Sequence, residues 1–187
     1  MQLFSRRADA LARVLLWFIA ALLVGVPLFL IAWVRTPYVT GQYSQVAQPI
    51  PFDHRHHVVD DGIDCLYCHI GAERSPHAGV PPTELCLNCH SQIWNSSPAL
   101  GLVWSSRRRD QPIPWQRVNY LPDFVFFNHS IHVGKGVACA TCHGRVDEMA
   151  RVYQAAPLTM GWCVDCHREQ NATAGRHAPL DCVTCHH

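Results

Sequence analysis

The pentapeptide Cys-Ala-Thr-Cys-His, residues 139–143, decides how this chain folds, because the pattern Cys-x-x-Cys-His occurs five times and uses all ten cysteines. Two thiols two residues apart on a short helical turn can reach the two vinyl groups of one haem as thioethers. The adjacent histidine then lies under the iron as its proximal ligand. The sequence therefore predicts five covalently bound haem c groups.

The ligands that this prediction assigns are of two kinds. The thioether cysteines are Cys65, Cys68, Cys86, Cys89, Cys139, Cys142, Cys163, Cys166, Cys182 and Cys185, and the proximal histidines are His69, His90, His143, His167 and His186. Zinc ribbons need two cysteine pairs per metal, which an odd number of pairs fits badly. Disulfides and thioredoxin-like redox pairs do not explain the invariable histidine, and the chain lacks a βαβ pattern.

An internal repeat supplies most of the distal ligands. The pattern Phe-x-His-x-x-His occurs at residues 52–57 and again at residues 127–132, each time shortly before a cysteine motif. Histidines three residues apart on a helical turn lie on one face and can reach two closely stacked haems. The predicted distal ligands are His54, His57, His129 and His132.

The fifth distal ligand is open between histidine and methionine. The candidates are His56, His77, His177, His187, Met149 and Met160. The sequence analysis favours Met149 or Met160, because a methionine ligand would raise the potential of that haem above its bis-histidine neighbours. The alternative for either methionine is packing against a haem.

The N-terminal part contains one long apolar run. Val14 to Val34 carries no charged residue, and as a helix it would be about 31 Å long, enough to cross a bilayer. Three arginines precede the run and one follows closely, so the positive-inside rule places the N-terminus in the cytoplasm. The alternative is a cleaved signal peptide, although the run exceeds the usual length of a signal h-region. Either interpretation exports the remainder.

The predicted fold is mostly α-helical and irregular, with one transmembrane helix and short helices and loops packed around five haems. Thirteen prolines and eleven glycines break the chain often, so the haems are expected to replace much of the peptide core. The formal charge is +1 with only one lysine, Lys135, and this excludes a basic surface for nucleic acid. The predicted organisation is 1–35 N-terminus and anchor, 36–51 linker and 52–187 haem domain, with repeat units 52–90 and 127–167, a spacer 91–126 and a fifth motif 182–186.

Several stretches together resemble one family. Phe-Asn-His at 127–129 leads to Cys-Ala-Thr-Cys-His-Gly at 139–144, and Pro-Leu-Thr-Met-Gly-Trp-Cys-Val-Asp-Cys-His-Arg occupies 157–168. With the anchor and five motifs, these resemble the pentahaem cytochrome c subunit ActA of bacterial alternative complex III. The resemblance implies a respiratory or photosynthetic inner-membrane complex that oxidises menaquinol and passes electrons to a periplasmic acceptor. It also implies partner subunits: an iron–sulfur protein, quinol-binding integral membrane proteins and a monohaem cytochrome c.

The preferred interpretation is thus an electron-transfer wire with its haem domain in the periplasm, not catalytic alone. One alternative is a free-standing quinol dehydrogenase resembling the NapC/NrfH group, but the motif count does not fit its tetrahaem form and no acidic residue adjoins the apolar run to take up protons. Another is a multihaem nitrite or sulfite reductase. That enzyme needs an open iron position, and the lysine that some reductases place in the motif is absent, since Lys135 follows no cysteine pair.

Overall fold

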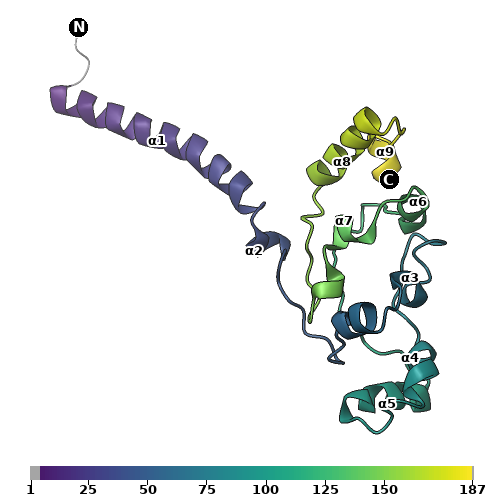
Figure 1. Ribbon diagram of the computed structural model, residues 1–187. Coiled ribbons are helices and arrows are strands. Elements are labelled where there is room, and N and C mark those ends of the chain that lie inside the picture. The colour runs from purple at the N-terminus through teal and green to yellow at the C-terminus, as the bar shows by residue number, and fades with distance from the viewer. Residues whose placement is uncertain (1–4, 187) are drawn as a thin grey trace. The chain divides into compact units, whose positions relative to one another are not determined.

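The apolar run near the N-terminus forms one continuous helix, α1 (Arg6–Trp33), in the computed structural model, which describes residues 5–186 (Figure 1). Ser5 caps this helix by accepting a hydrogen bond from the backbone N–H of Ala8 at 3.3 Å. The helix is long and apolar enough to cross a membrane, and none of its apolar window is buried. A signal sequence near the N-terminus would meet the same criterion.

A short helix, α2 (Pro37–Thr40), follows α1. Proline suits its first position, and the helix stops at Gly41, whose φ of 71° lies in the left-handed region that glycine tolerates. The chain divides here into two units, one running to Gly41 and the other starting at Gln42.

The second unit consists of short helices joined by loops. Its elements are η1 (Arg55–Asp60, a π-helix), α3 (Cys65–Cys68), α4 (Thr83–His90), η2 (Pro98–Leu100), α5 (Gly101–Arg109), α6 (His129–Gly134), α7 (Cys139–His143), η3 (Val146–Glu148), α8 (Met160–Thr173) and α9 (Cys182–Cys185). Within residues 5–186 the only β pairing is an isolated bridge between Gln45 and Tyr153. The predicted fold class, mostly helical and irregular, is confirmed.

Apolar packing of the chain on itself is concentrated in one small cluster. Ile50, Leu100, Val103 and Ile113 are buried there, and Leu87 of α4 packs against them. Residues 91–126, predicted as a spacer or a docking segment, contain η2 and α5, which supply half of this buried cluster. Among the described residues no large side chain is completely buried, as expected for a chain whose apolar core is completed by bound cofactors.

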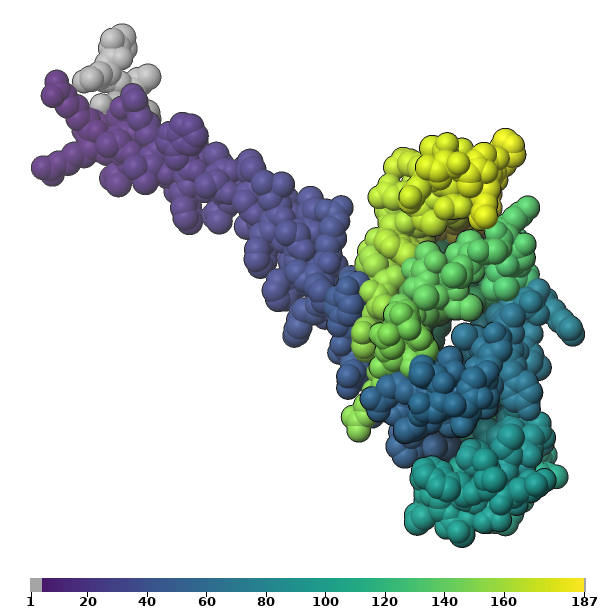
Figure 2. Space-filling model, viewed as in Figure 1, coloured from purple at the N-terminus to yellow at the C-terminus, as the bar shows by residue number. Residues whose placement is uncertain are grey.

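A buried glutamine ties the start of the second unit to two distant segments. Gln154 is only 4% exposed. Its backbone carbonyl accepts from the N–H of Tyr43 at 2.9 Å, and its Oε1 accepts from the N–H of Tyr120 at 3.2 Å. These bonds, with the bridge between Gln45 and Tyr153, fix the stretch that leads into η1. In the space-filling view the blue start of the second unit lies against the light-green segment of the chain (Figure 2).

Candidate functional site

All five cysteine motifs lie on helices, three of which begin at the first cysteine and two of which begin three residues before it. Side-chain caps explain why three of the helices start where they do. Asp64 accepts from the N–H of Leu66 at 2.7 Å at the start of α3, and Asp181 accepts from the N–H of Thr184 at 3.0 Å at the start of α9. In α8, Thr159 accepts from the N–H of Trp162 at 3.4 Å. None of the ten cysteines is paired in a disulfide, so each motif presents two sulfur atoms one turn apart.

The motif histidines are oriented by backbone carbonyls. Their Nδ1 atoms donate to carbonyl oxygens in four cases: His69 to Gly79 at 2.8 Å, His90 to Ile93 at 3.3 Å, His167 to Pro179 at 2.6 Å and His186 to Phe124 at 3.2 Å. An imidazole that donates from Nδ1 keeps its lone pair on Nε2. Such a hydrogen bond is the usual second-shell partner of a metal-binding histidine.

The predicted distal histidines lie in two similar segments. In both, a phenylalanine contacts both histidine rings: Phe52 lies 4.8 Å from His54 and 4.4 Å from His57, centroid to centroid, and Phe127 lies at the same two distances from His129 and His132. Three of these histidines donate from Nδ1 to a carbonyl oxygen, His57 to Asp53 at 3.1 Å, His129 to Pro76 at 2.7 Å and His132 to Asn128 at 2.8 Å. Their Nε2 atoms are therefore also available to a metal.

Three distal histidines each face a motif histidine at nearly the same separation. The ring centroids are 6.2 Å apart for His57 and His90, 6.3 Å for His129 and His143, and 6.2 Å for His132 and His167. Two imidazoles bound through Nε2 at about 2 Å on opposite sides of one metal ion would have centroids about 6 Å apart. The residues present therefore fit three haem irons, each held between two histidines.

The remaining predicted distal histidine, His54, is half-buried near His69 of the first motif. Burial, and then the neighbouring His69 and His57, lower its pKa to about 4. Its Nδ1 is buried and has no hydrogen-bond partner. Burial followed by His129 and His69 likewise lowers the pKa of His143. Both rings are thus held neutral, which is the protonation state that a metal ligand needs.

The candidates for the fifth distal ligand lie in different surroundings. Met149 is 6% exposed, and its Cε would lie 3.4 Å from a Cβ placed on Gly144, directly after the third motif. Met160 is 71% exposed on the first turn of α8. His56 is exposed and bonds through Nδ1 to Asp60 at 2.8 Å. The other candidates are His77 and His177, both exposed, and His187, which lies outside the described residues.

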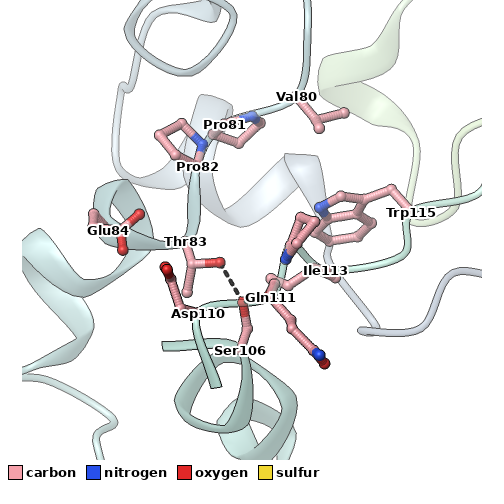
Figure 3. Close-up of a pocket in the computed structure, with 11 residues that line it drawn as sticks. Val80, Pro81, Pro82, Thr83, Glu84, Ser106, Asp110, Gln111, Ile113 and Trp115 are labelled. Atoms are coloured by element: carbon pink, nitrogen blue, oxygen red, sulfur yellow. Dashed lines mark hydrogen bonds between the residues drawn. The ribbon is translucent and has the colours of Figure 1, made fainter. Parts of the chain in front are cut away.

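A cavity of about 310 Å³ lies between the first turn of α4 and the end of α5 (Figure 3). Apolar side chains such as Ile113 and Trp115 line it together with Thr83 and Ser106. These two hydroxyls bond to each other at 2.7 Å, and the Ser106 hydroxyl also donates to the carbonyl of Gln111. The hydroxyl groups of Thr83 and Ser106 that line the cavity are thus already hydrogen-bonded within the protein.

The comparisons with known proteins agree with this geometry. A family described as "Cytochrome c7 and related cytochrome c" matches residues 125–187, which contain the last three motifs. The chain is also 30% identical over 165 residues to the "Menaquinone reductase, multiheme cytochrome c subunit" of Nitratidesulfovibrio vulgaris strain Hildenborough, covering 77% of this chain and 79% of that protein. This chain is a multihaem cytochrome c. As in other cytochromes c, its haem is covalently attached.

Some functional features of this multihaem cytochrome were missed by the sequence analysis. The carbonyl acceptors of the histidine Nδ1 atoms could not be identified, because every residue has a carbonyl and only the fold decides which one lies near a ring. The contact of Phe52 and Phe127 with two histidines each was signalled by the repeated Phe-x-His-x-x-His spacing, although no role was assigned to the phenylalanines.

Proposed function

We propose that this multihaem cytochrome c is the five-haem electron-transfer subunit of a quinol-linked membrane complex, of the alternative complex III type. The proposal rests on one observation: the rings of three predicted distal histidines face the rings of three motif histidines, with their centroids 6.2–6.3 Å apart. When bound, closely spaced haems transfer single electrons from one to the next. Histidine pairs that would hold each iron from two sides suit electron transfer and would leave no open position for a substrate at iron.

The proposed axial pairs follow from the contacts. Three are the facing pairs His57 with His90, His129 with His143, and His132 with His167. The fourth is His54 with His69, which of the neighbouring ionisable groups has the largest effect on the pKa of His54. In each pair the protein's contribution is to fix the ring and its tautomer through the hydrogen bonds to Nδ1 or through burial.

For His186 we propose Met160 as the distal partner. Burial and then the thiol of Cys185 raise the pKa of Cys163, so the fourth and fifth motifs approach each other here. Met160 lies one turn before Cys163 on the same helix and therefore on the same face. Met149, in contrast, is buried beside the third motif, where His143 already faces His129.

Substitution of the two methionines by leucine distinguishes their roles. Met160→Leu is expected to abolish the weak red absorption band of a methionine-ligated ferric haem. Met149→Leu keeps the volume of a buried side chain and should retain the band, so it serves as the matched control. Retention of the band in Met160→Leu, or its loss only in Met149→Leu, would refute the assignment.

The proposed location is the bacterial inner membrane, with α1 as a single-pass anchor and the haem unit in the periplasm. The apolar run and the arginines before it support this orientation. N-terminal sequencing of the membrane-bound holoprotein tests the anchor directly. Retention of residues 1–35 is expected, whereas a mature chain that begins after α1 would show a cleaved signal.

The direction of electron flow has two candidates. The resemblance to alternative complex III favours menaquinol oxidation, with electrons leaving toward a periplasmic acceptor. The name of the Nitratidesulfovibrio relative, a menaquinone reductase subunit, favours the opposite direction. We propose menaquinol oxidation, because the resemblance includes the anchor and the number of motifs.

Purification of the native protein in mild detergent is the test of the complex. Mass spectrometry is expected to find five haems on this chain and to find iron–sulfur, multi-span membrane and monohaem cytochrome subunits with it. A menaquinol analogue should then reduce the haems, as read from their α-band absorbance. Isolation of the chain alone, still reducible by quinol, would support a free-standing dehydrogenase. Haems that quinol leaves oxidised, but that lose electrons to added menaquinone once reduced, would support the menaquinone-reducing direction.

A further inference from the structure

The five motifs do not follow one another in space as they do in the sequence. Contacts among the described residues link the motifs two at a time. In each link, one segment of the chain contacts groups that belong to the sites of both motifs. Four such connections are present in the second unit, in which α4, α3, α7, α8 and α9 carry the five motifs (Figure 1).

The first connection joins the second motif to the first through η1. The ring of His57 faces that of His90 in the second motif at 6.2 Å. The carbonyl of His57 also accepts from the backbone N–H of Ile63, two residues before Cys65 of the first motif, at 2.9 Å. In agreement, burial and then His69 of the first motif lower the pKa of His54 at the start of the same helix. Phe52 contacts both distal rings and holds them in one block. Burial and then Cys68 raise the pKa of Cys86, which agrees with the closeness of the two motifs.

The second connection joins the first motif to the third through the loop of residues 75–79. The carbonyl of Gly79 accepts from Nδ1 of His69 at 2.8 Å, and the carbonyl of Pro76 accepts from Nδ1 of His129 at 2.7 Å. The backbone N–H of Ser130 also donates to the carbonyl of Ser75 at 3.2 Å. One short loop therefore orients a ligand of the first site and a ligand of the third.

The thiols of these two motifs are close as well. Burial and then the neighbouring Cys139 raise the pKa of Cys65. The first and third motifs thus approach each other both at their histidines and at their cysteines, although the second motif lies between them in the sequence.

The third connection joins the third motif to the fourth through α6. His129 faces His143 at 6.3 Å, and His132, on the next turn, faces His167 at 6.2 Å. Burial, followed by Cys166 and Cys163, raises the pKa of Cys142. The second repeat thus joins its two motifs in the same way as the first repeat.

The fourth connection joins the fourth motif to the fifth. Nδ1 of His167 donates to the carbonyl of Pro179, in the segment that leads into α9, at 2.6 Å. The fifth motif is held from the other side by the N–H of Phe126, which donates to the carbonyl of Cys185 at 2.9 Å. Phe126 directly precedes Phe127 and α6, and α6 joins the third motif to the fourth. The third and fifth motifs are therefore both connected to the stretch that runs from Phe126 into α6.

We propose that the five haem-attachment sites form a single row in the order second, first, third, fourth, fifth, so that the second motif and not the first ends the row. This inference rests on the proposed function, because it requires haem at each motif. Contacts of α4 fit a terminal position: its Leu87 packs against the peptide cluster around Val103 of α5. The stretch of residues 91–126, which contains α5, thus lies against one end of the row.

Two variants of neighbouring distal ligands test the order. His54→Met changes the site of His69, and His57→Met changes the site of His90, with both substitutions on the same short helix. A methionine ligand raises the potential of its haem, so the altered site, like the His186 site with its proposed Met160 ligand, is reduced before the bis-histidine sites in a redox titration. An electron on the altered site shifts the EPR or NMR signals of directly neighbouring sites. The sites whose signals shift at this stage in the variant but not in the native protein are counted.

His54→Met should shift the signals of two other sites and His57→Met the signals of one. The order of the sequence requires the reverse, one for His54→Met and two for His57→Met. The reverse result, or equal numbers in the two variants, would overturn the proposed row. Mass spectrometry of the native chain separates this failure from failure of the proposed function, because fewer than five haems would refute the latter whatever the order.

A measurement on the native holoprotein applies if either variant fails to accumulate with its full set of haems. The iron positions, located by anomalous scattering in crystals of the native protein, are assigned to motifs from the chain trace. The iron bound by His90 is expected at one end of the row, with the iron bound by His69 as its only neighbour. A terminal position for the iron bound by His69 would overturn the inference.

Discussion

The two Phe-x-His-x-x-His segments, which we call the first cassette (residues 52–57) and the second cassette (residues 127–132), are almost the same locally. The phenylalanine lies edge-on to the first histidine in both, at 85° and 90°, and stacks on the second at 28° in both. The backbone differs, since the first cassette leads into a π-helix and the second into an α-helix. The ring geometry therefore does not depend on the helix type that follows.

The surroundings of the two cassettes differ at the first histidine. His129 donates from Nδ1 to Pro76 of the loop that also orients His69, whereas Nδ1 of His54 is buried without a partner. An unpaired buried polar group costs free energy, and a bound metal at the other ring nitrogen is one way to hold such a ring. We therefore expect the second cassette to be held in place by the protein itself and the first to depend more on its cofactor.

Removal of one pair of thioether cysteines should reveal the difference between the two cassettes most strongly. Cys65→Ser with Cys68→Ser, and in a second protein Cys139→Ser with Cys142→Ser, should each lose one haem and several kcal/mol of stability, because cofactor binding contributes folding free energy. Residues 55–60 should lose more protection in the first protein than residues 129–134 lose in the second. Mass spectrometry and hydrogen exchange measure both effects. Equal loss of protection would show that the Pro76 bond is unimportant.

Truncation of the two phenylalanines should have a smaller and equal effect. Phe52→Ala and Phe127→Ala each remove contacts with two histidine rings, at a cost of roughly 2–4 kcal/mol. Denaturant unfolding of the holoprotein measures the cost, and the leucine variants at the same positions serve as controls that keep apolar volume. A difference between the two alanine variants well above 1 kcal/mol would mean that the cassettes are not energetically equivalent.

A methyl group at Gly71 should disturb the loop that joins the first and third motifs. A Cβ there would lie 2.6 Å from the carbonyl oxygen of His77 and 2.8 Å from that of Ala78, so Gly71→Ala is expected to cost about 1–3 kcal/mol. The control is Gly134→Ala on α6, where a Cβ would meet nothing within 4 Å. This control should be neutral or stabilising. A Gly71→Ala protein as stable as the control would contradict the closeness of this loop.

Lowering the pH should produce the smallest of the expected differences in stability between the two cassettes. Asp53 and Asn128 occupy equivalent positions and accept from the N–H groups of Arg55 and Ser130, both at 2.9 Å. The side-chain hydrogen bond from Arg55 is the largest cause that lowers the pKa of Asp53 from 3.8 to about 2. Because the folded pKa is below the unfolded one, this stabilisation is complete above about pH 4 and is lost as the pH falls toward 2.

Hydrogen exchange of the Arg55 and Ser130 amides across this pH range measures the difference. The Arg55 amide should lose protection relative to Ser130 as the pH falls, because Asn128 does not titrate. In Asp53→Asn, which keeps an oxygen acceptor, the two amides should respond alike. A relative loss that persists in Asp53→Asn would assign the acid response to other groups.

The sequence predicted the fold class correctly, because haem attachment leaves a local pattern of cysteine and histidine. Its assignment of the cassette histidines as distal ligands stays a prediction. It treated residues 91–126 as a spacer, although α5 supplies part of the buried cluster around Val103. That cluster joins segments far apart in the chain, and no local periodicity signals it. It left Met149 and Met160 equivalent, whereas their burial separates them clearly.

The amino-acid sequence alone predicts which atoms could bind haem, since thioether spacing and the distance between histidines on one turn are local properties of the chain. Which histidine faces which and which carbonyl orients each ring are set by the fold, as is the proposed order of the motifs. These depend on contacts between distant segments, such as Pro76 with His129 and Phe126 with Cys185. Such contacts form between backbone groups that every residue carries, so they leave no mark in the sequence.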